Sequence, residues 1–275
     1  MERYELSMRE NQQAALEIMK SVAQLCQKLD LRYYLAYGSL IGAIRHEGFI
    51  PWDDDLDIWM PRADYSKLIA YFQDNAEALE PLRLFSIYNN ADYPYMITRI
   101  SDCRYEVVTH NEKSYGLGAF IDIYPMDGMG NTVEEYTALK NKASRYSSLC
   151  FLSTRLRCEK GNTKSRMKLL VKYPAFLYAK IRGKRYFMNA LESMAKDRDY
   201  DGSAYIGCLV WGSDGIKCVF PRQWFETTVD VPFEGCTLKA PAEYDQVLRR
   251  LYGDYMKLPP EEDRIGHHFY RTYKK

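Results

Sequence analysis

Residues 35–60 read LAYGSLIGAIRHEGFIPWDDDLDIWM and join a turn of small residues to a cluster of carboxylates. If the last of them form a strand, its alternation places Leu56 and Ile58 on one face and Asp55 and Asp57 on the other. Neighbouring carboxylates repel each other, and a hard cation such as Mg2+ relieves the repulsion by taking oxygen ligands from both. The stretch therefore predicts a strand that is buried on one face and holds a metal ion on the other.

Length and composition are those of a globular protein without a distinctive overall charge. The chain has 275 residues and a formal net charge of +1, which favours no class of charged partner. Its seven cysteines are scattered and lack the spacing of a zinc site or a disulfide framework. The charged start and the lack of an apolar run of about 18 residues predict a cytoplasmic protein.

The spacing of apolar residues predicts helices and strands around the acidic stretch. A capping-box pattern at Ser7 and Glu10 marks the start of the first helix. Two strands, over 95–100 and 105–108, are expected to pair with each other. The other predicted elements are helices over 8–28, 40–46 and 62–79 and strands over 32–36, 82–88 and 119–125.

Composition changes after Thr132, where a second capping box with Glu135 opens a helical pattern that runs to about residue 196. The basic segment, residues 140–185, contains 14 Lys or Arg and one acid, Glu159. Such a block is typical of a solvated helical face. The alternative is attraction to polyphosphate or to an acidic membrane leaflet, because apolar residues over 169–181 also fit an amphipathic helix lying on a membrane.

The organisation of the chain follows from these changes in composition. The sequence has no internal repeat, which favours one compact unit around one site. Within that unit we expect a catalytic core over 1–130, a basic helical insertion over 131–200, and a C-terminal α/β part over 201–275 that completes the same unit.

A third acid and a small-residue turn extend the predicted site. Asp122 lies in the apolar run 119–125, and three carboxylates on two strands suit a two-metal phosphoryl-transfer site. Asp122 is then a candidate to accept the proton of the attacking hydroxyl, and Asp127 competes with it for this role. The alternative is that Asp122 is only a loop acid that caps the turn at residues 124–125. Gly38 and Ser39 lie at a strand-to-helix turn, which either approaches a phosphate closely or is simply a capped turn.

The run over 37–58 closely resembles the signature of the LicD family of phosphocholine transferases, which also includes fukutin-type enzymes. The runs FIDIYPMD, residues 120–127, and LYGDYMKLPP, residues 251–260, are similar to the family as well. The middle of the chain, from residue 140 to about residue 201, has no motif that resembles it. The resemblance covers the predicted acids and both flanks of the chain.

The resemblance implies an α+β fold with a nucleotidyltransferase-like mixed sheet flanked by helices. It also implies metal-dependent transfer of phosphocholine from CDP-choline to a sugar hydroxyl, with release of CMP. The acceptor would be a cell-surface glycan such as lipopolysaccharide, or a teichoic acid precursor of the cell wall. Because such acceptors are lipid-linked, the enzyme is expected at the inner face of the membrane, in peripheral contact with its anionic surface and without any nucleic-acid partner.

The resemblance carries five residues over to this chain by position. Gly38 and Ser39 match the Gly-Ser motif of the fold, Asp55 and Asp57 match its paired metal acids, and Asp122 matches its third acid. Mg2+ or Mn2+ is therefore the expected cofactor, held by the three acids. The gap of roughly 15 residues between Ser39 and Asp55 is longer than is usual across the wider superfamily but normal for this family.

Basic side chains near the motif are candidates for holding phosphate. Arg45 has the planar donors of a phosphate clamp, with a salt bridge at a helix end as the alternative. Arg99, on the strand over 95–100, is a second candidate. His46 is expected to be structural, with a charge that is favourable at the C-terminus of a short helix. His267 reaches the site only if the tail folds back.

Choline is a quaternary ammonium ion, which proteins hold against the faces of aromatic rings. The chain is rich in tyrosine, with 24 residues, so each aromatic candidate competes with a simple packing role. The aromatic residues that lie near the motif in sequence are Trp52, Tyr93, Tyr95 and Tyr124.

Two other functions compete with phosphotransfer. A glycosyltransferase also uses Asp-x-Asp to hold a metal and a nucleotide sugar, but it predicts a longer nucleotide-binding region than the 54 residues that precede Asp55. A non-catalytic protein could bind anionic polymer through the basic segment, but it leaves the three acids unexplained. We therefore expect a phosphotransferase enzyme.

Overall fold

The computed structural model describes residues 4–158, 166–212, 215–266 and 270–275, and side chains from residue 172 onward in the helix that begins at 166. Its central sheet has the strand order β2-β3-β7-β5-β4, in which β3 and β7 are parallel and the other pairs antiparallel. β8 and β9 continue the sheet from the far end of β7. These strands are β2 (Tyr34–Leu35), β3 (Asp57–Pro61), β4 (Leu82–Phe85), β5 (Thr98–Asp102), β7 (Ala119–Gly130), β8 (Tyr205–Gly207) and β9 (Val219–Pro221).

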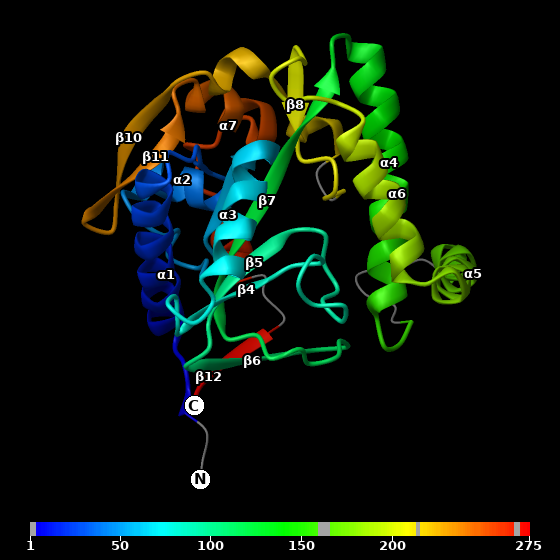
Figure 1. Cartoon of the computed structure of the whole chain (residues 1–275), viewed down its shortest axis with the longest axis horizontal. Helices are drawn as coiled ribbons and strands as arrows, with labels where there is room; N and C mark the ends of the chain where they lie inside the picture. Colours follow the sequence, from blue (N-terminus) through cyan, green and yellow to red (C-terminus); the bar gives the residue numbers. More distant parts are fainter. Residues whose placement is uncertain (1–3, 159–165, 213–214, 267–269) are drawn as a thin grey trace.

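Two smaller sheets bring distant parts of the chain together. β1 (Tyr4–Glu5), β12 (Tyr270–Lys274) and β6 (Tyr105–Thr109) form one, and the C-terminus lies beside it (Figure 1). The other is the hairpin of β10 (Thr228–Phe233) and β11 (Cys236–Pro241). The predicted pairing of 95–100 with 105–108 is wrong, because both edges of β5 are used by β4 and β7.

Helices surround the central sheet. Figure 1 shows α1 and α3 beside the sheet, whereas α4 and α6 pack together at the end of β7 and α5 lies outermost. The helices are α1 (Met8–Lys28), α2 (Tyr37–His46), α3 (Arg62–Asp74), α4 (Val133–Thr154), α5 (Arg166–Arg182), α6 (Lys184–Lys196) and α7 (Tyr244–Tyr252), with short 3-10 helices at Gly215–Cys218, Arg222–Phe225 and Glu261–Asp263.

Local signals predicted several helices well. α1 has the predicted bounds, and its capping box between Ser7 and Glu10 is present. The helical pattern after Thr132 is confirmed as α4 to α6, although only half of the second capping box forms. Thr132 accepts the N–H of Glu135, whereas the carboxylate of Glu135 accepts the N–H of Asn131. α3 ends at Asp74 rather than at residue 79.

The acidic strand is buried on both faces, not on one as predicted. Ile58 and Met60 are fully buried on one side, but Trp59 on the other side is only 1% exposed. The rings of Tyr37 and Phe220 cover Trp59, with centroids 4.9 Å and 5.5 Å away. An aromatic layer therefore lies where the alternation alone suggested solvent.

The α+β class is confirmed, with a mixed sheet flanked by helices that is consistent with a nucleotidyltransferase-like fold. None of the seven cysteines, all of which lie in the described parts of the chain, forms a disulfide. No helix among the described residues has the length and apolar content needed to cross a membrane. The division of the chain at residues 130 and 200 stays a prediction.

Candidate active site

Three charged side chains lie in one row across the central sheet. Asp57 on β3 is the register partner of Asp122 on β7, and Asp122 is the register partner of Arg99 on β5. Adjacent strands lie about 4.8 Å apart, and residues in register point to the same face. Two carboxylates and one guanidinium therefore stand side by side.

Arg99, which was predicted to bind a phosphate, instead binds Asp122, the third predicted acid. Its Nε and Nη2 donate to the two carboxylate oxygens of Asp122 at 2.6 and 3.4 Å. The guanidinium lies 4.4 Å from the ring centroid of Tyr95 and 4.1 Å from that of Phe120, and it donates to the Tyr115 hydroxyl. Arg99 thus lies over Tyr95, one of the four aromatic candidates for choline.

Asp122 is paired directly with Arg99, whereas no such ion pair to Asp57 is found among the described residues. The residue is 6% exposed, and among the described residues its buried Oδ1 finds no hydrogen-bond partner. Burial, with the charges of Asp55 and Asp122 added, raises the pKa of Asp57 well above its ordinary value. A buried carboxylate oxygen of this kind is a natural place for a cation.

The three acids predicted to hold a metal lie near one another, and one of them is paired with a cation. In the described part of the chain, no three or more His, Cys, Asp and Glu side chains are grouped so as to hold a metal ion. Both carboxylate oxygens of Asp122 accept from Arg99. Asp55 is half-buried just before β3, close enough to act on Asp57. Oxygen ligands from these two acids, one of them with an unsatisfied buried atom, fit a hard divalent cation.

The first turn of α2 lies against the acids. α2 begins at Tyr37, three residues earlier than predicted, so Gly38 and Ser39 belong to the helix. The Ser39 hydroxyl accepts the backbone N–H of Asp57 at 2.8 Å. A Cβ on Gly38 would lie 2.8 Å from Oδ2 of Asp53, so glycine permits this close approach. The positive end of the helix dipole therefore faces the acidic loop, residues 53–55, which leads into β3.

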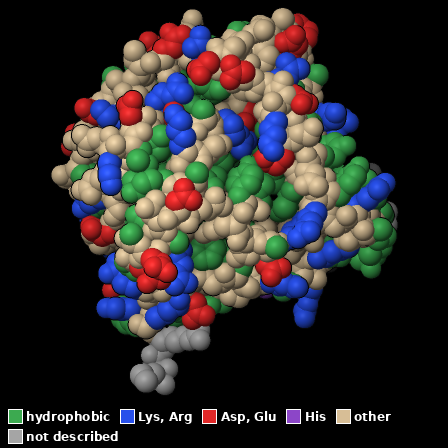
Figure 2. Space-filling model, viewed as in Figure 1, with side chains coloured by type: hydrophobic (Ala, Val, Ile, Leu, Met, Phe, Trp, Pro, Cys, Tyr) green, Lys and Arg blue, Asp and Glu red, His purple; other side chains and the backbone are tan. Residues whose placement is uncertain are grey.

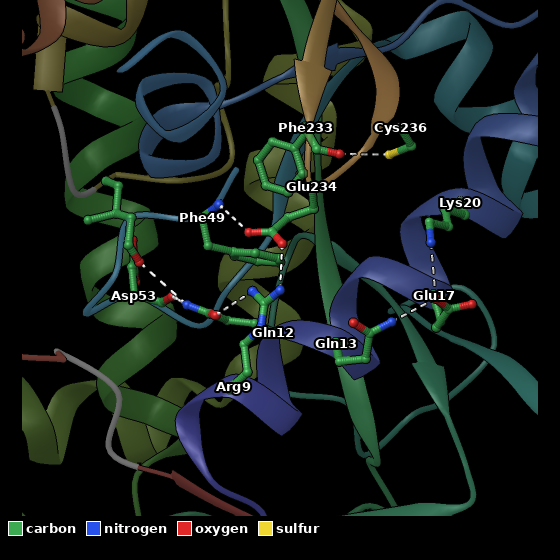
Figure 3. Close-up of polar contacts among 11 residues, drawn as sticks. Arg9, Gln12, Gln13, Glu17, Lys20, Phe49, Asp53, Phe233, Glu234 and Cys236 are labelled. Atoms are coloured by element: carbon green, nitrogen blue, oxygen red, sulfur yellow. Dashed lines mark hydrogen bonds and ion pairs between the residues drawn. The ribbon is translucent and has the colours of Figure 1, made fainter. Parts of the chain in front are cut away.

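The acidic loop is braced by α1 and by the β10–β11 hairpin (Figure 3). Gln12 donates to the carbonyl oxygen of Asp53 at 2.8 Å and accepts from Arg9 at 3.2 Å. Glu234, at the hairpin turn, pairs with Arg9 at 2.6 Å and accepts the N–H of Phe49. These residues are far apart in the chain, and no local sequence signal marks Gln12 or Glu234.

The other predicted phosphate ligands lie elsewhere. Arg45 donates to the Tyr255 carbonyl at 2.6 Å and to His46 at 3.0 Å, which directs it to the C-terminal tail. Burial, together with the charge of Arg45, lowers the pKa of His46. Asp127 forms a buried pair with Arg62, with contacts of 2.6 and 2.9 Å, and is not joined to the other acids. His267 lies outside the described residues.

Two tyrosines border the acids. Tyr124 packs on Tyr37 at 5.1 Å, and burial with the charges of Asp57 and Asp122 raises its pKa. No sequence signal marked Tyr270, which the pairing of β12 with β6 brings close to Phe120, with centroids 5.3 Å apart. Of the other choline candidates, Tyr93 and Tyr95 pack in the cluster around Arg99, and Trp52 lies under Arg264.

Known proteins resemble this chain over both the site and the whole length. Residues 30–156 match the family model described as LicD/FKTN/FKRP, nucleotidyltransferase domain. The chain is 33% identical over 270 residues to the lipopolysaccharide cholinephosphotransferase LicD of Haemophilus influenzae, with 98% of each chain covered. An uncharacterized protein of Rickettsia typhi is 32% identical over 111 residues, which cover 40% of this chain and 33% of that protein.

The matched region contains the strands that carry all three charged residues of the row. The similarity to the Haemophilus influenzae protein extends beyond it to nearly the whole of both chains. The chain therefore belongs to the LicD family of phosphotransferases.

Proposed function

We propose that the protein transfers phosphocholine from CDP-choline to a sugar hydroxyl of a cell-surface glycan or teichoic acid precursor, with release of CMP. The observation that carries the proposal is the row of Asp57, Asp122 and Arg99 beside the N-terminus of α2. Its substrate class is supported by the relative named as a lipopolysaccharide cholinephosphotransferase.

A divalent cation, Mg2+ or Mn2+, belongs to this proposal. Asp55 and Asp57 would hold it, since the buried oxygen of Asp57 needs a positive partner. Asp122 would join them through Oδ2, whose contact with Arg99 is the longer one at 3.4 Å, while Oδ1 stays bound to Arg99. When bound, the cation supplies charge neutralisation for the diphosphate of the donor.

The protein's own groups position the reactants. The first turn of α2, with the backbone of Gly38 and the hydroxyl of Ser39, receives a phosphate of the donor. Asp122 accepts the proton of the acceptor hydroxyl, and Arg99 fixes the orientation of that carboxylate. The sugar oxygen forms a bond to the phosphorus of phosphocholine while the bond to the CMP oxygen breaks, so CMP leaves with the electron pair.

The proposal includes docking of α5 on an anionic bilayer. Tyr173, Leu177 and Ile181 follow one another at intervals of four residues and are 56%, 44% and 85% exposed. Figure 2 shows hydrophobic side chains gathered beside Lys and Arg over α5. Apolar residues flanked by cations complement a membrane with acidic headgroups.

Vesicle sedimentation tests the docking step. At low salt the protein is expected to bind vesicles that contain phosphatidylglycerol and not vesicles of phosphatidylcholine alone. Ile181→Glu should weaken binding about tenfold or more, whereas Ile216→Glu, which alters an exposed isoleucine on a different element, should leave it unchanged. Equal binding to both vesicles, or dimerisation without vesicle binding, would contradict docking.

CMP release tests the reaction. The protein is incubated with Mg2+, a glycan acceptor and, in separate reactions, CDP-choline, CDP-ribitol, CDP-glycerol or a nucleotide sugar. We expect CMP and a phosphocholine-modified glycan from CDP-choline, loss of both with EDTA, and recovery on adding Mg2+ back. Turnover of the nucleotide sugar alone would refute the proposal.

A further inference from the structure

A cavity of about 590 Å3 lies between the basic segment and the catalytic core. Its walls come from α4, from α5, and from the loops around residues 95 and 211. This volume is within the range of small-molecule sites. The lining residues that carry the argument are Tyr95, Ser147, Ser148, Phe151, Lys172 and Trp211.

The cavity is one layer of side chains away from the acids. Tyr95 forms part of its lining, and the ring of Tyr95 packs on Arg99, which binds Asp122. Trp211 lines the cavity as well and lies 5.9 Å from Tyr124, two residues along β7 from Asp122. A ligand in the cavity is therefore next to the reacting groups without occupying their place.

Residues of the basic segment hold the lining of the cavity in place. Lys140 is buried, and its ammonium donates to the carbonyl oxygens of Cys208 and Trp211, the latter at 2.6 Å. This lysine fixes the loop that presents Trp211. At the end of α4, Arg155 pairs with Glu112, which accepts from the Tyr95 hydroxyl at 2.6 Å. These contacts hold two aromatic rings in place around the cavity.

Charge decides which part of the reaction the cavity serves. Quaternary ammonium groups bind to aromatic cages, and a nearby cation opposes them by Coulomb repulsion. The rings of Tyr95 and Phe151, which line this cavity, already face the guanidinium groups of Arg99 and Arg155, at 4.4 and 3.7 Å from their centroids. No acidic residue is among the described residues that line it. Aromatic rings with the hydroxyls of Ser147 and Ser148 suit the apolar faces and hydroxyl groups of a sugar instead.

We infer that this cavity is a subsite for a sugar of the acceptor glycan, next to the sugar whose hydroxyl reacts. The inference rests on the proposed function, because it identifies where the acceptor of that reaction lies. The choline end of the donor binds elsewhere. The basic segment thereby has a second role, since its first helix forms part of the acceptor site.

Calorimetric titration with a phosphocholine-free oligosaccharide from lipopolysaccharide tests the subsite. Trp211→Leu should weaken binding about tenfold, the effect of losing one aromatic contact, and raise the acceptor KM by a similar factor. The matched control is Trp224→Leu, which removes another half-buried tryptophan outside the cavity and should change neither value. Choline chloride should not displace the oligosaccharide.

A second variant keeps the test sound if Trp211→Leu fails to fold. Ser148→Ile fills the cavity from the surface of α4 and should also weaken oligosaccharide binding, whereas Ser21→Ile on α1 should not. Unchanged oligosaccharide affinity in Trp211→Leu or Ser148→Ile, or displacement by choline, would overturn the subsite. Tryptophan-dependent sugar binding without CMP release would refute the proposed function and leave the subsite intact.

Discussion

The acid centre, formed by Asp55, Asp57 and Asp122, and the basic segment carry their charges in opposite ways. Asp57 and Asp122 are 6% and 7% exposed and stand side by side on adjacent strands. Most described cations of the basic segment lie on helix surfaces, where water screens them. A buried like-charge pair costs free energy and therefore points to function, whereas a dispersed basic surface by itself does not.

Lys140 is an exception in the basic segment and sharpens the contrast. It is 1% exposed and binds two carbonyl oxygens, so it is structural, although Asn141 and Lys142 directly after it are exposed. Charge counted along a sequence does not separate these two uses of lysine. Burial and hydrogen-bond partners do separate them.

The largest effect is expected at the centre of the acid row. Asp57→Asn should reduce transfer about 10^2- to 10^3-fold, because it removes one of the carboxylates proposed to hold the cation that neutralises the diphosphate of the donor. The same change should raise the melting temperature by about 2–4 °C, the shift that 1 kcal/mol gives in a chain of this size, because a buried repulsive charge is lost. Assays of CMP release and calorimetric melting measure the two effects.

Asp230→Asn is the control for this change, because the Asp230 side chain is exposed on the β10–β11 hairpin and pairs with Lys239. It should leave both activity and melting temperature near those of the wild type. If Asp57→Asn remained active or melted at a lower temperature than the wild type, Asp57 would not be a repelled functional charge.

Buried and exposed arginines should respond differently to the same substitution. Arg99→Met leaves the carboxylate of Asp122 buried without its partner and should destabilise the protein by about 3–5 kcal/mol. Arg182→Met alters an exposed arginine of the basic segment and should change stability by less than about 0.5 kcal/mol. Urea denaturation gives both values, and similar losses in the two variants would remove the contrast.

The brace on the acidic loop should matter for activity more than for stability. Gln12→Leu removes the hydrogen bond to the Asp53 carbonyl and should lower transfer about tenfold, with a loss of about 1 kcal/mol. Gln13→Leu changes the adjacent, exposed glutamine that pairs with Glu17. It should lower neither transfer activity nor stability. Kinetics on both variants distinguish loop positioning from a general effect on α1.

The smallest effect concerns pH. Hydrogen bonding from Arg9 lowers the pKa of Glu234 below its ordinary value of 4.5. Its stabilising contribution is therefore present above pH 4.5 and lost as pH falls through the lowered pKa. Because its partner Arg9 is 63% exposed, the loss is no more than about 1 kcal/mol.

Glu234→Gln should flatten the acid limb of the stability curve between about pH 5 and pH 3. At pH 7 the free energy of unfolding should fall by the contribution of the Arg9 pair, no more than about 1 kcal/mol. Chemical denaturation across this range provides the measurement, and an acid limb identical to that of the wild type would show that the Arg9 pair contributes nothing.

Sequence patterns predicted the parts of the molecule that depend on neighbouring residues. The capping box at Ser7 and the spacing of apolar residues gave α1 its bounds, because these contacts are made within one or two helical turns. Alternation placed Asp57 opposite Ile58, as the structure has them. The roles of the three acids in holding a metal stay predictions.

Other features depended on contacts that alternation does not encode. The second buried face of β3 comes from rings such as Phe220, which are distant in sequence. β6 pairs with β12 rather than with β5, because both edges of β5 pair with other strands, β4 and β7. Arg45 was predicted as a phosphate ligand, but in the fold it donates to the Tyr255 carbonyl.

The sequence by itself therefore determined the local elements, the α+β class and the carboxylates of the acid centre. Tertiary structure alone decided how their charges are balanced: Arg99 binds Asp122 across neighbouring strands, while Asp57 keeps a buried oxygen without a partner among the described residues. The physical reason is range. Helix caps and side-chain alternation act over a few residues, whereas counter-charge and burial are set by strands and helices that meet only when the whole chain has folded.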